Sequence, residues 1–146
     1  MSIVVKDLVK RYGHQTVVDR ISLEIDEGEL FVLLGASGSG KSTVLRMIAG
    51  LVPVDDGRVL LHGEDVTDWS PQARNIGLVF QNYSLFPHMT VAENVEFGLA
   101  VRKVDPAERA ERCDELLALV GLAGLGRRNV RQLSGGQQQR VAVARA

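Results

Sequence analysis

The hydrophobic residues follow a strand-like spacing in the first part of the chain and a helical spacing later. Ile21, Leu23 and Ile25 are separated by polar residues, which predicts a half-buried strand. Residues 30–34 are all apolar, a pattern typical of a strand that is buried on both faces. Three further short apolar runs predict strands at 2–6, 58–62 and 76–80, the last of them buried.

Helical patterns have clear start signals. Residues 42–49 form a mostly apolar segment that ends at Gly50, and this predicts a buried helix. Thr90 and Glu93 match a capping box, so a helix is expected from there to about Val101.

Two more helices are expected in the last third of the chain. Asp105 followed by Pro106 is a start signal, because proline suits the first helical position. One apolar face with helical spacing then contains Cys113, Leu116, Leu117 and Val120. Ser134 is expected to cap a last helix that runs to the end of the sequence.

A phosphate-binding motif lies between the predicted strand 30–34 and the predicted helix 42–49. The motif G-x-x-x-x-G-K-[ST] is matched by Gly35, Ala36, Ser37, Gly38, Ser39, Gly40, Lys41 and Ser42, followed by Thr43. Backbone N–H groups of such a loop surround a polyphosphate, and the helix dipole favours the same negative charge. Lys41 is expected to reach the β- and γ-phosphates, Ser42 to bind Mg²⁺, and Thr43 to support the α-phosphate side. The sequence therefore predicts ATP and Mg²⁺ as ligands.

Composition excludes several function classes. With 17 basic and 18 acidic residues the net charge is −1, which gives no support for a nucleic-acid partner. The one cysteine, Cys113, has no partner for an internal disulfide, which suits a reducing compartment. The sequence has no apolar run of about 18 residues, so a membrane role would act through a partner.

A second glycine-containing motif gives the chain a family resemblance. The residues Leu133, Ser134, Gly135, Gly136 and Gln137 resemble the signature sequence of ABC transporter nucleotide-binding domains. The resemblance implies a dimer that holds two ATP molecules between its subunits. In it, Ser134, Gly135, Gly136 and Gln137 contact the ATP bound by the phosphate loop of the opposite subunit.

Two weaker matches agree with this resemblance. Gln81, directly after the predicted strand 76–80, corresponds to the family's Q-loop glutamine, which contacts Mg²⁺ and the attacking water. The resemblance thus gives catalytic roles to Lys41 and Gln81, and Mg²⁺ ligation to Ser42 and Gln81. Tyr12 corresponds to the aromatic residue that stacks on adenine. By contrast, Glu64 and Asp65 do not match the family's acidic strand in position, and we interpret them as part of a turn.

The resemblance implies an α/β P-loop NTPase core of the ABC ATPase type, with an N-terminal antiparallel β subdomain and a helical subdomain. The expected divisions are 1–84 (β-rich ATP-binding core), 85–133 (helical subdomain) and 134–146 (signature helix). Residues 86–95 most resemble the importers of polyamines, sulfate, ferric iron or sugars. The implied partners are a second ATP-binding subunit, membrane permease subunits and a solute-binding protein. The implied location is the cytoplasmic face of the cell membrane.

Two alternatives remain open at the level of sequence: a soluble ABC ATPase without a transport role, and a nucleotide-binding module without hydrolysis. The sequence ends inside an apolar helical pattern at Val141–Ala146. In the family, the Walker B aspartate and the catalytic glutamate follow this helix, so we expect a fold that is incomplete at its C-terminus. We expect these 146 residues alone to be essentially inactive as an ATPase. Asn129–Gln132 also differs from the Tyr-Pro pattern that is common in relatives.

Overall fold

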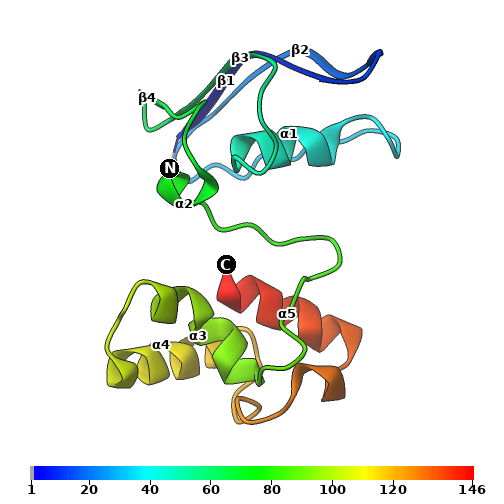
Figure 1. The fold of residues 1–146 in the computed structure, drawn as a ribbon. Helices are drawn as coiled ribbons and strands as arrows, with labels where there is room; N and C mark the ends of the chain where they lie inside the picture. The colour runs from blue at the N-terminus through cyan, green and yellow to red at the C-terminus, as the bar shows by residue number, and fades with distance from the viewer. Residues whose placement is uncertain (1) are drawn as a thin grey trace. The chain divides into compact units, whose positions relative to one another are not determined.

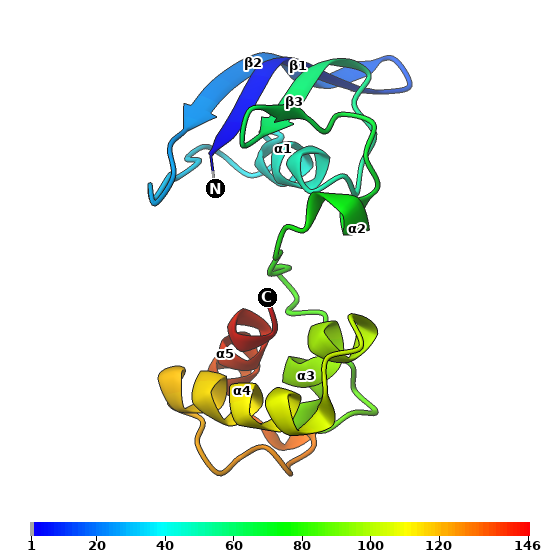
Figure 2. The same cartoon turned by 90° about the vertical axis from the view of Figure 1, so that its left-hand side faces the viewer.

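The structure, a computed structural model, describes residues 2–146. Two compact units divide the chain, Met1–Ile76 and Gly77–Ala146. Figures 1 and 2 show each unit from two directions. All the strands assigned within residues 2–146 belong to the first unit, together with the helix at the phosphate loop. The three longest helices belong to the second unit.

The first unit contains a four-stranded antiparallel sheet. Its strands are β1 (Ile3–Tyr12), β2 (Gln15–Ile25), β3 (Asp56–Leu61) and β4 (Glu64–Asp65), in the order β2-β1-β3-β4. Every adjacent pair is antiparallel. This confirms the expected N-terminal antiparallel β subdomain. The first strand is longer than predicted, because β1 continues past Lys6 through bulges in its pairing.

Helix α1 (Lys41–Ile48) packs against one face of this sheet, as both views show. Val44, Met47 and Ile48 enter a core that also contains Leu8 and Val59. Burial of these apolar side chains is the main stabilising contribution to the unit. The predicted burial of this helix is therefore confirmed on the face that meets the core, whereas Leu45 is exposed.

Two strand predictions were wrong. Residues 30–34 and 76–80 are irregular and pair with no strand of the described chain. Leu30 and Leu34 are both 89% exposed, whereas Leu33 packs against the first core. An apolar run becomes a strand only when a neighbouring strand pairs with its N–H and C=O groups, and residues 2–146 supply none here.

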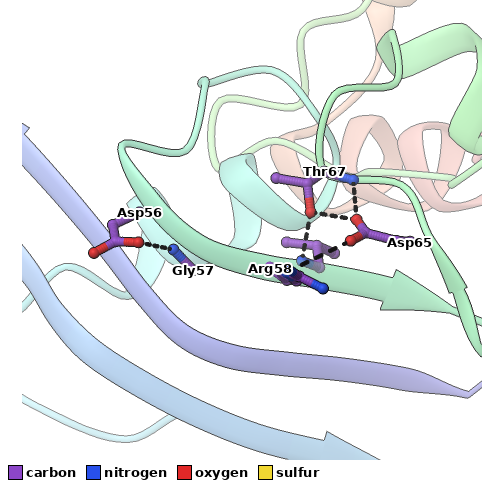
Figure 3. A network of polar contacts seen from close by, with 6 residues as sticks. Asp56, Gly57, Arg58, Asp65 and Thr67 are labelled. Atoms are coloured by element: carbon purple, nitrogen blue, oxygen red, sulfur yellow. Dashed lines mark hydrogen bonds and ion pairs between the residues drawn. The ribbon is translucent and has the colours of Figure 1, made fainter.

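The segment at Glu64–Asp65 is a strand rather than part of a turn, because side chains stabilise a β3–β4 hairpin (Figure 3). The Thr67 hydroxyl donates to the Asp65 carboxylate (2.6 Å) and accepts from the N–H of Val59 (3.0 Å). The Thr67 N–H also donates to Asp65 (3.0 Å). These bonds lower the pKa of Asp65, with Thr67 as the main cause. Asp65 thus has a structural role in the hairpin.

The second unit is helical. Its helices are α3 (Val91–Val101), α4 (Pro106–Leu119) and α5 (Gly135–Arg145), with a short 3₁₀ helix η1 (Val130–Gln132) before α5. Figures 1 and 2 show the three α-helices packed around one core. That core includes Val91, Val95, Cys113, Leu117 and Val141.

The predicted helix starts are confirmed. Thr90 and Glu93 form a reciprocal capping box, Asp105 caps α4 with Pro106 at its first position, and Ser134 caps α5. In the segment that departs from the family pattern, Asn129 caps η1 in the same way. Each cap satisfies helix N–H groups that would otherwise lack partners.

Candidate functional site

The phosphate loop connects the irregular segment 30–34 to α1. Gly40 is the N-cap of α1 in a left-handed conformation (φ 87°), and no side chain caps this helix. A Cβ at this position would lie 2.7 Å from the carbonyl oxygen of Val17 on β2. Only glycine therefore fits here, and the helix N-terminus remains open toward an anion.

The Lys41 ammonium lies inside this loop. It donates to the carbonyl oxygens of Gly35 (2.8 Å) and Ala36 (2.7 Å) and to the hydroxyl of Ser39 (3.1 Å). Three acceptors thus satisfy its three N–H donors without a counter-anion. Negatively charged phosphate oxygens are stronger acceptors than these neutral groups. The Lys41 ammonium would therefore gain by exchanging its bonds to these loop oxygens for bonds to phosphate oxygens.

Ser42 and Thr43 lie in the first turn of α1, next to Lys41. The Ser42 side chain is exposed, and its hydroxyl oxygen is the type of ligand that Mg²⁺ prefers. A hollow of about 290 Å³ adjoins the loop, with Val18 and Leu33 among its apolar lining residues and Lys41 among its polar ones.

The other end of α1 is held by an arginine that the sequence analysis missed. Arg74, at the end of the short helix α2 (Pro71–Arg74), is only 6% exposed. Its guanidinium donates to the carbonyl oxygens of Met47 (2.7 Å), Ile48 (2.8 Å), Thr67 (2.7 Å) and Trp69 (3.2 Å). Burial lowers the pKa of Arg74, although a guanidinium in a protein remains charged. The cation also interacts favourably with the negative end of the α1 dipole.

Tyr12 lies at the end of β1 and is 51% exposed. The ammonium of Lys10 is 5.6 Å from the centre of its ring, a cation–π distance. Lys10 is itself buried and bonds to Asp55 (2.7 Å) and to the carbonyl of Pro53 (2.8 Å). The hydrogen bond from Lys10, and then that from the N–H of Arg11, lowers the pKa of Asp55. The ring of Tyr12 is thus exposed and supported by a fixed ion pair.

Gln81 is exposed and lies in the irregular segment after residues 76–80. Tyr83 and Ser84, which follow it, both have a left-handed backbone (φ 61° and 47°). Arg145 of α5 donates to the carbonyl oxygens of Ser84 (2.7 Å) and Tyr83 (3.0 Å). No short motif indicates this contact, since its partners are 61 and 62 residues apart in the chain.

The signature residues form the start of α5. The Ser134 hydroxyl accepts the N–H of Gln137 (3.3 Å), and the Gln137 side-chain oxygen accepts the N–H of Ser134 (3.0 Å). Gly135 and Gly136 are exposed, and a Cβ on either would meet no atom within 4 Å. At Gly135 and Gly136 the N-terminus of α5 is therefore accessible, as the N-terminus of α1 is at the phosphate loop.

The structure places Tyr12 and residues 35–43 in the first unit, and Gln81 and residues 134–137 in the second. Residues 35–43 and 134–137 lie at helix N-termini, whereas Tyr12 ends a strand and Gln81 lies in an irregular segment. Among residues 2–146, no helix combines the length and the apolar character that are needed to cross a membrane.

Comparison with known proteins identifies the family of the chain. The ABC transporter family model matches residues 18–146. The chain is 52% identical over all 146 residues to the sulfate/thiosulfate import ATP-binding protein CysA of Synechocystis sp., and it covers 41% of that protein. It is also 52% identical, over 99% of its own length and 41% of the relative, to the Fe(3+) ions import ATP-binding protein FbpC of Vibrio cholerae. The chain thus spans about two fifths of the length of these relatives.

Solved structures give the same assignment. A dimeric ATP-binding cassette in a post-hydrolysis state, bound to ADP and Pi, matches 98% of this chain with a TM-score of 0.87 and 34% identity. The match covers 68% of that structure. A second dimeric structure, of a bacterial ABC transporter cassette, matches with a TM-score of 0.88 and 36% identity over 98% of this chain and 68% of that one. The chain therefore belongs to the ABC transporter family, and its fold is that of the ABC ATPase cassette.

Proposed function

We propose that this chain is the ATP-binding region of a subunit that couples ATP hydrolysis to solute import through a membrane permease. The carrying observation is the Lys41 ammonium, which lies within 3.1 Å of three loop oxygens at the uncapped N-terminus of α1. The names of the relatives, import ATP-binding proteins for sulfate/thiosulfate and for Fe(3+), support import rather than a soluble role.

In this proposal the N–H groups of residues 35–43 surround the polyphosphate and Lys41 binds the β- and γ-phosphates. Thr43 supports the α-phosphate side, and Tyr12 stacks on adenine. Ser42 and Gln81 would hold Mg²⁺ through oxygen atoms, and the ion would neutralise charge on the phosphate oxygens. Gln81 orients the attacking water. The water oxygen would bond to the γ-phosphorus while the bond from that phosphorus to the β–γ bridging oxygen breaks. The proton that water loses would pass to an oxygen of the released phosphate, and ADP is the leaving group.

The proposed partner at the signature is a second ATP-binding subunit. Ser134, Gly135, Gly136 and Gln137 would contact the γ-phosphate of the ATP that this second subunit binds. The open outer side of the α5 N-terminus supports this role, and so does the dimeric state of the similar solved cassettes. The dimer would act at the cytoplasmic face of the membrane, together with permease subunits and a solute-binding protein.

We further propose that the 146-residue polypeptide alone binds ATP weakly and turns it over negligibly. Exposed apolar side chains in segment 30–34, directly before the phosphate loop, support this reading, because a loop is positioned by the strand that precedes it. A steady-state phosphate-release assay on the 146-residue polypeptide tests it. If the 146-residue polypeptide hydrolysed ATP as fast as the protein does at its full natural length, the proposal would be contradicted.

The test of ATP binding is Lys41→Ala in the protein at its full natural length. We expect loss of measurable ATP binding by isothermal titration calorimetry, since the cation that meets the phosphates is gone. Lys6→Ala, an exposed lysine on β1, is the matched control and should bind ATP as the wild type does. Equal ATP affinity in the two variants would refute the assigned site.

A further inference from the structure

The loop that contains Gln81 approaches the C-terminal end of α5 on both sides. Before Gln81, the backbone of Gly77 lies so close to the Ala146 carbonyl that a Cβ on residue 77 would collide with it. After Gln81, Tyr83 and Ser84 accept the two hydrogen bonds from Arg145. Gln81 thus lies in a loop that packs closely against the end of α5 before it and is hydrogen-bonded to α5 after it.

The attachment after Gln81 holds an unfavourable backbone. Tyr83 and Ser84 are two consecutive non-glycine residues in the left-handed region. Such residues persist only when surrounding contacts stabilise them. The turn has local bonds, in which the Ser84 hydroxyl donates to Asn82 (2.7 Å) and the Tyr83 N–H donates to the Phe80 carbonyl (2.9 Å). Arg145 supplies the long-range bonds.

Arg145 is well suited to this contact. Its planar guanidinium donates to two carbonyl oxygens at once, which a lysine ammonium does with poorer geometry. The cation also lies 5.5 Å from the centre of the Phe86 ring, which is fixed in turn by Phe97 of α3 at 4.5 Å. Asn94 of α3 further bonds both the N–H (2.8 Å) and the carbonyl (3.1 Å) of Phe86.

The same helix has the signature residues at its other end. Ser134 is the N-cap of α5, and Arg145 is its last residue. Val141 and Ala144 of α5 are buried in the helical core between these two ends. A helix packed in this way transmits a displacement of one end to the other as a rigid element.

We propose that Arg145 is a positioning residue that fixes Gln81 through the turn at Tyr83–Ser84, so that movement of the signature end of α5 is transmitted to Gln81. The inference rests on the proposed function, because it gives Gln81 a role in ATP hydrolysis. It adds a physical link between the two elements of this unit that are expected to meet ATP.

The first test is Arg145→Lys in the protein at its full natural length, with Arg112→Lys as control. Arg112 is also a helical arginine, but its bond to Glu115 (3.1 Å) lies at the surface. We expect Arg145→Lys to lower kcat for ATP about five- to twentyfold, while the Kd for ATP stays within about twofold. Arg112→Lys should change neither value. An unchanged kcat for Arg145→Lys, or a loss confined to the Kd, would overturn the inference.

A double-mutant cycle distinguishes a positioning role from a general structural one. In a Gln81→Ala background, Arg145→Lys should lower kcat less than about twofold, because Arg145 acts through Gln81. Ser84→Gly should restore most of the kcat lost in Arg145→Lys, since glycine adopts the left-handed backbone without cost. If the losses in kcat from Arg145→Lys and Gln81→Ala were additive, or if Ser84→Gly restored none of the lost kcat, the positioning role of Arg145 would be refuted.

Hydrogen exchange provides a readout that is independent of activity. Arg145→Lys should increase amide exchange in residues 80–86 and leave residues 134–140 unchanged. Unchanged exchange in 80–86 would disprove the attachment itself. A wild-type protein without ATPase turnover would instead overturn the proposed function and the catalytic part of this inference, even where exchange shows that the attachment exists.

Discussion

Arg74 provides a quantitative test of how the phosphate-loop helix is held. Its buried guanidinium makes four hydrogen bonds to backbone carbonyls, two of them to the last turn of α1. A hydrogen bond to a charged group contributes about 1.5–3 kcal/mol, but four bonds to one buried side chain share its desolvation cost and do not add. Removing Arg74 leaves these carbonyl oxygens without this donor, at about 1–3 kcal/mol for each acceptor that stays buried, so the loss at the whole site is about 3–5 kcal/mol. We therefore expect Arg74→Met to lower the free energy of unfolding of the first unit by that amount.

This loss is large for so small a unit. At about 0.05–0.15 kcal/mol per residue, the whole stability of Met1–Ile76 is about 4–11 kcal/mol. Trp69 is the only tryptophan of the chain, and it belongs to this unit, so its fluorescence during urea unfolding follows the relevant transition. Arg74→Lys should lower the free energy of unfolding about half as much as Arg74→Met, because a lysine ammonium reaches fewer of the four carbonyl oxygens.

Arg58→Met is the matched control for this measurement. Arg58 is 3.9 Å from Asp65, and its side chain is 73% exposed, so its ion pair contributes about 0–1 kcal/mol. A loss below about 1 kcal/mol in Arg74→Met, or a loss equal to that of Arg58→Met, would refute the assigned role of the four bonds.

Three further predictions concern other parts of the chain. Gly40→Ala should weaken ATP binding at least about tenfold by calorimetry, because the new Cβ meets the Val17 carbonyl in a left-handed backbone; unchanged affinity would contradict this. The pKa of Asp55 is lowered by Lys10, so this carboxylate stabilises the fold above its unfolded pKa of about 3.9 and the contribution is lost as pH falls through the lower folded value. Urea unfolding between about pH 2 and 6 should therefore show a flatter profile for Asp55→Asn than for the wild type; equal slopes would count against the ion pair. Burial, and then nearby acidic groups, raises the pKa of Cys113 to about 11, so its thiol should react with a disulfide reagent at pH 8 only after unfolding; rapid reaction of the folded protein would show that it is not buried.

The helix starts could be predicted from sequence because their causes are local. Thr90 and Ser134 each bond to a residue three positions away, so the pattern that specifies the cap lies within one turn. The phosphate loop was identified for the same reason, since its glycines and Lys41 are adjacent in sequence.

The errors have a different physical origin. Residues 30–34 and 76–80 have strand-like composition, yet a strand also requires a partner that pairs with it, and composition does not report whether one is present. The contacts of Arg74 with α1 and of Arg145 with the Tyr83–Ser84 turn join residues 26 to 62 positions apart. No periodicity or short motif in a single sequence indicates such pairs.

The most direct test of the account compares ATP binding and turnover in Ser134→Arg at full natural length. If Ser134 contacts the ATP of the opposite subunit, the variant should keep a Kd for ATP within about twofold and lose turnover at least about a hundredfold. Gln139→Arg, an exposed position one turn further along α5, should retain both properties. Turnover preserved in Ser134→Arg would contradict the shared site, and loss of ATP binding would place Ser134 at the ATP of its own subunit.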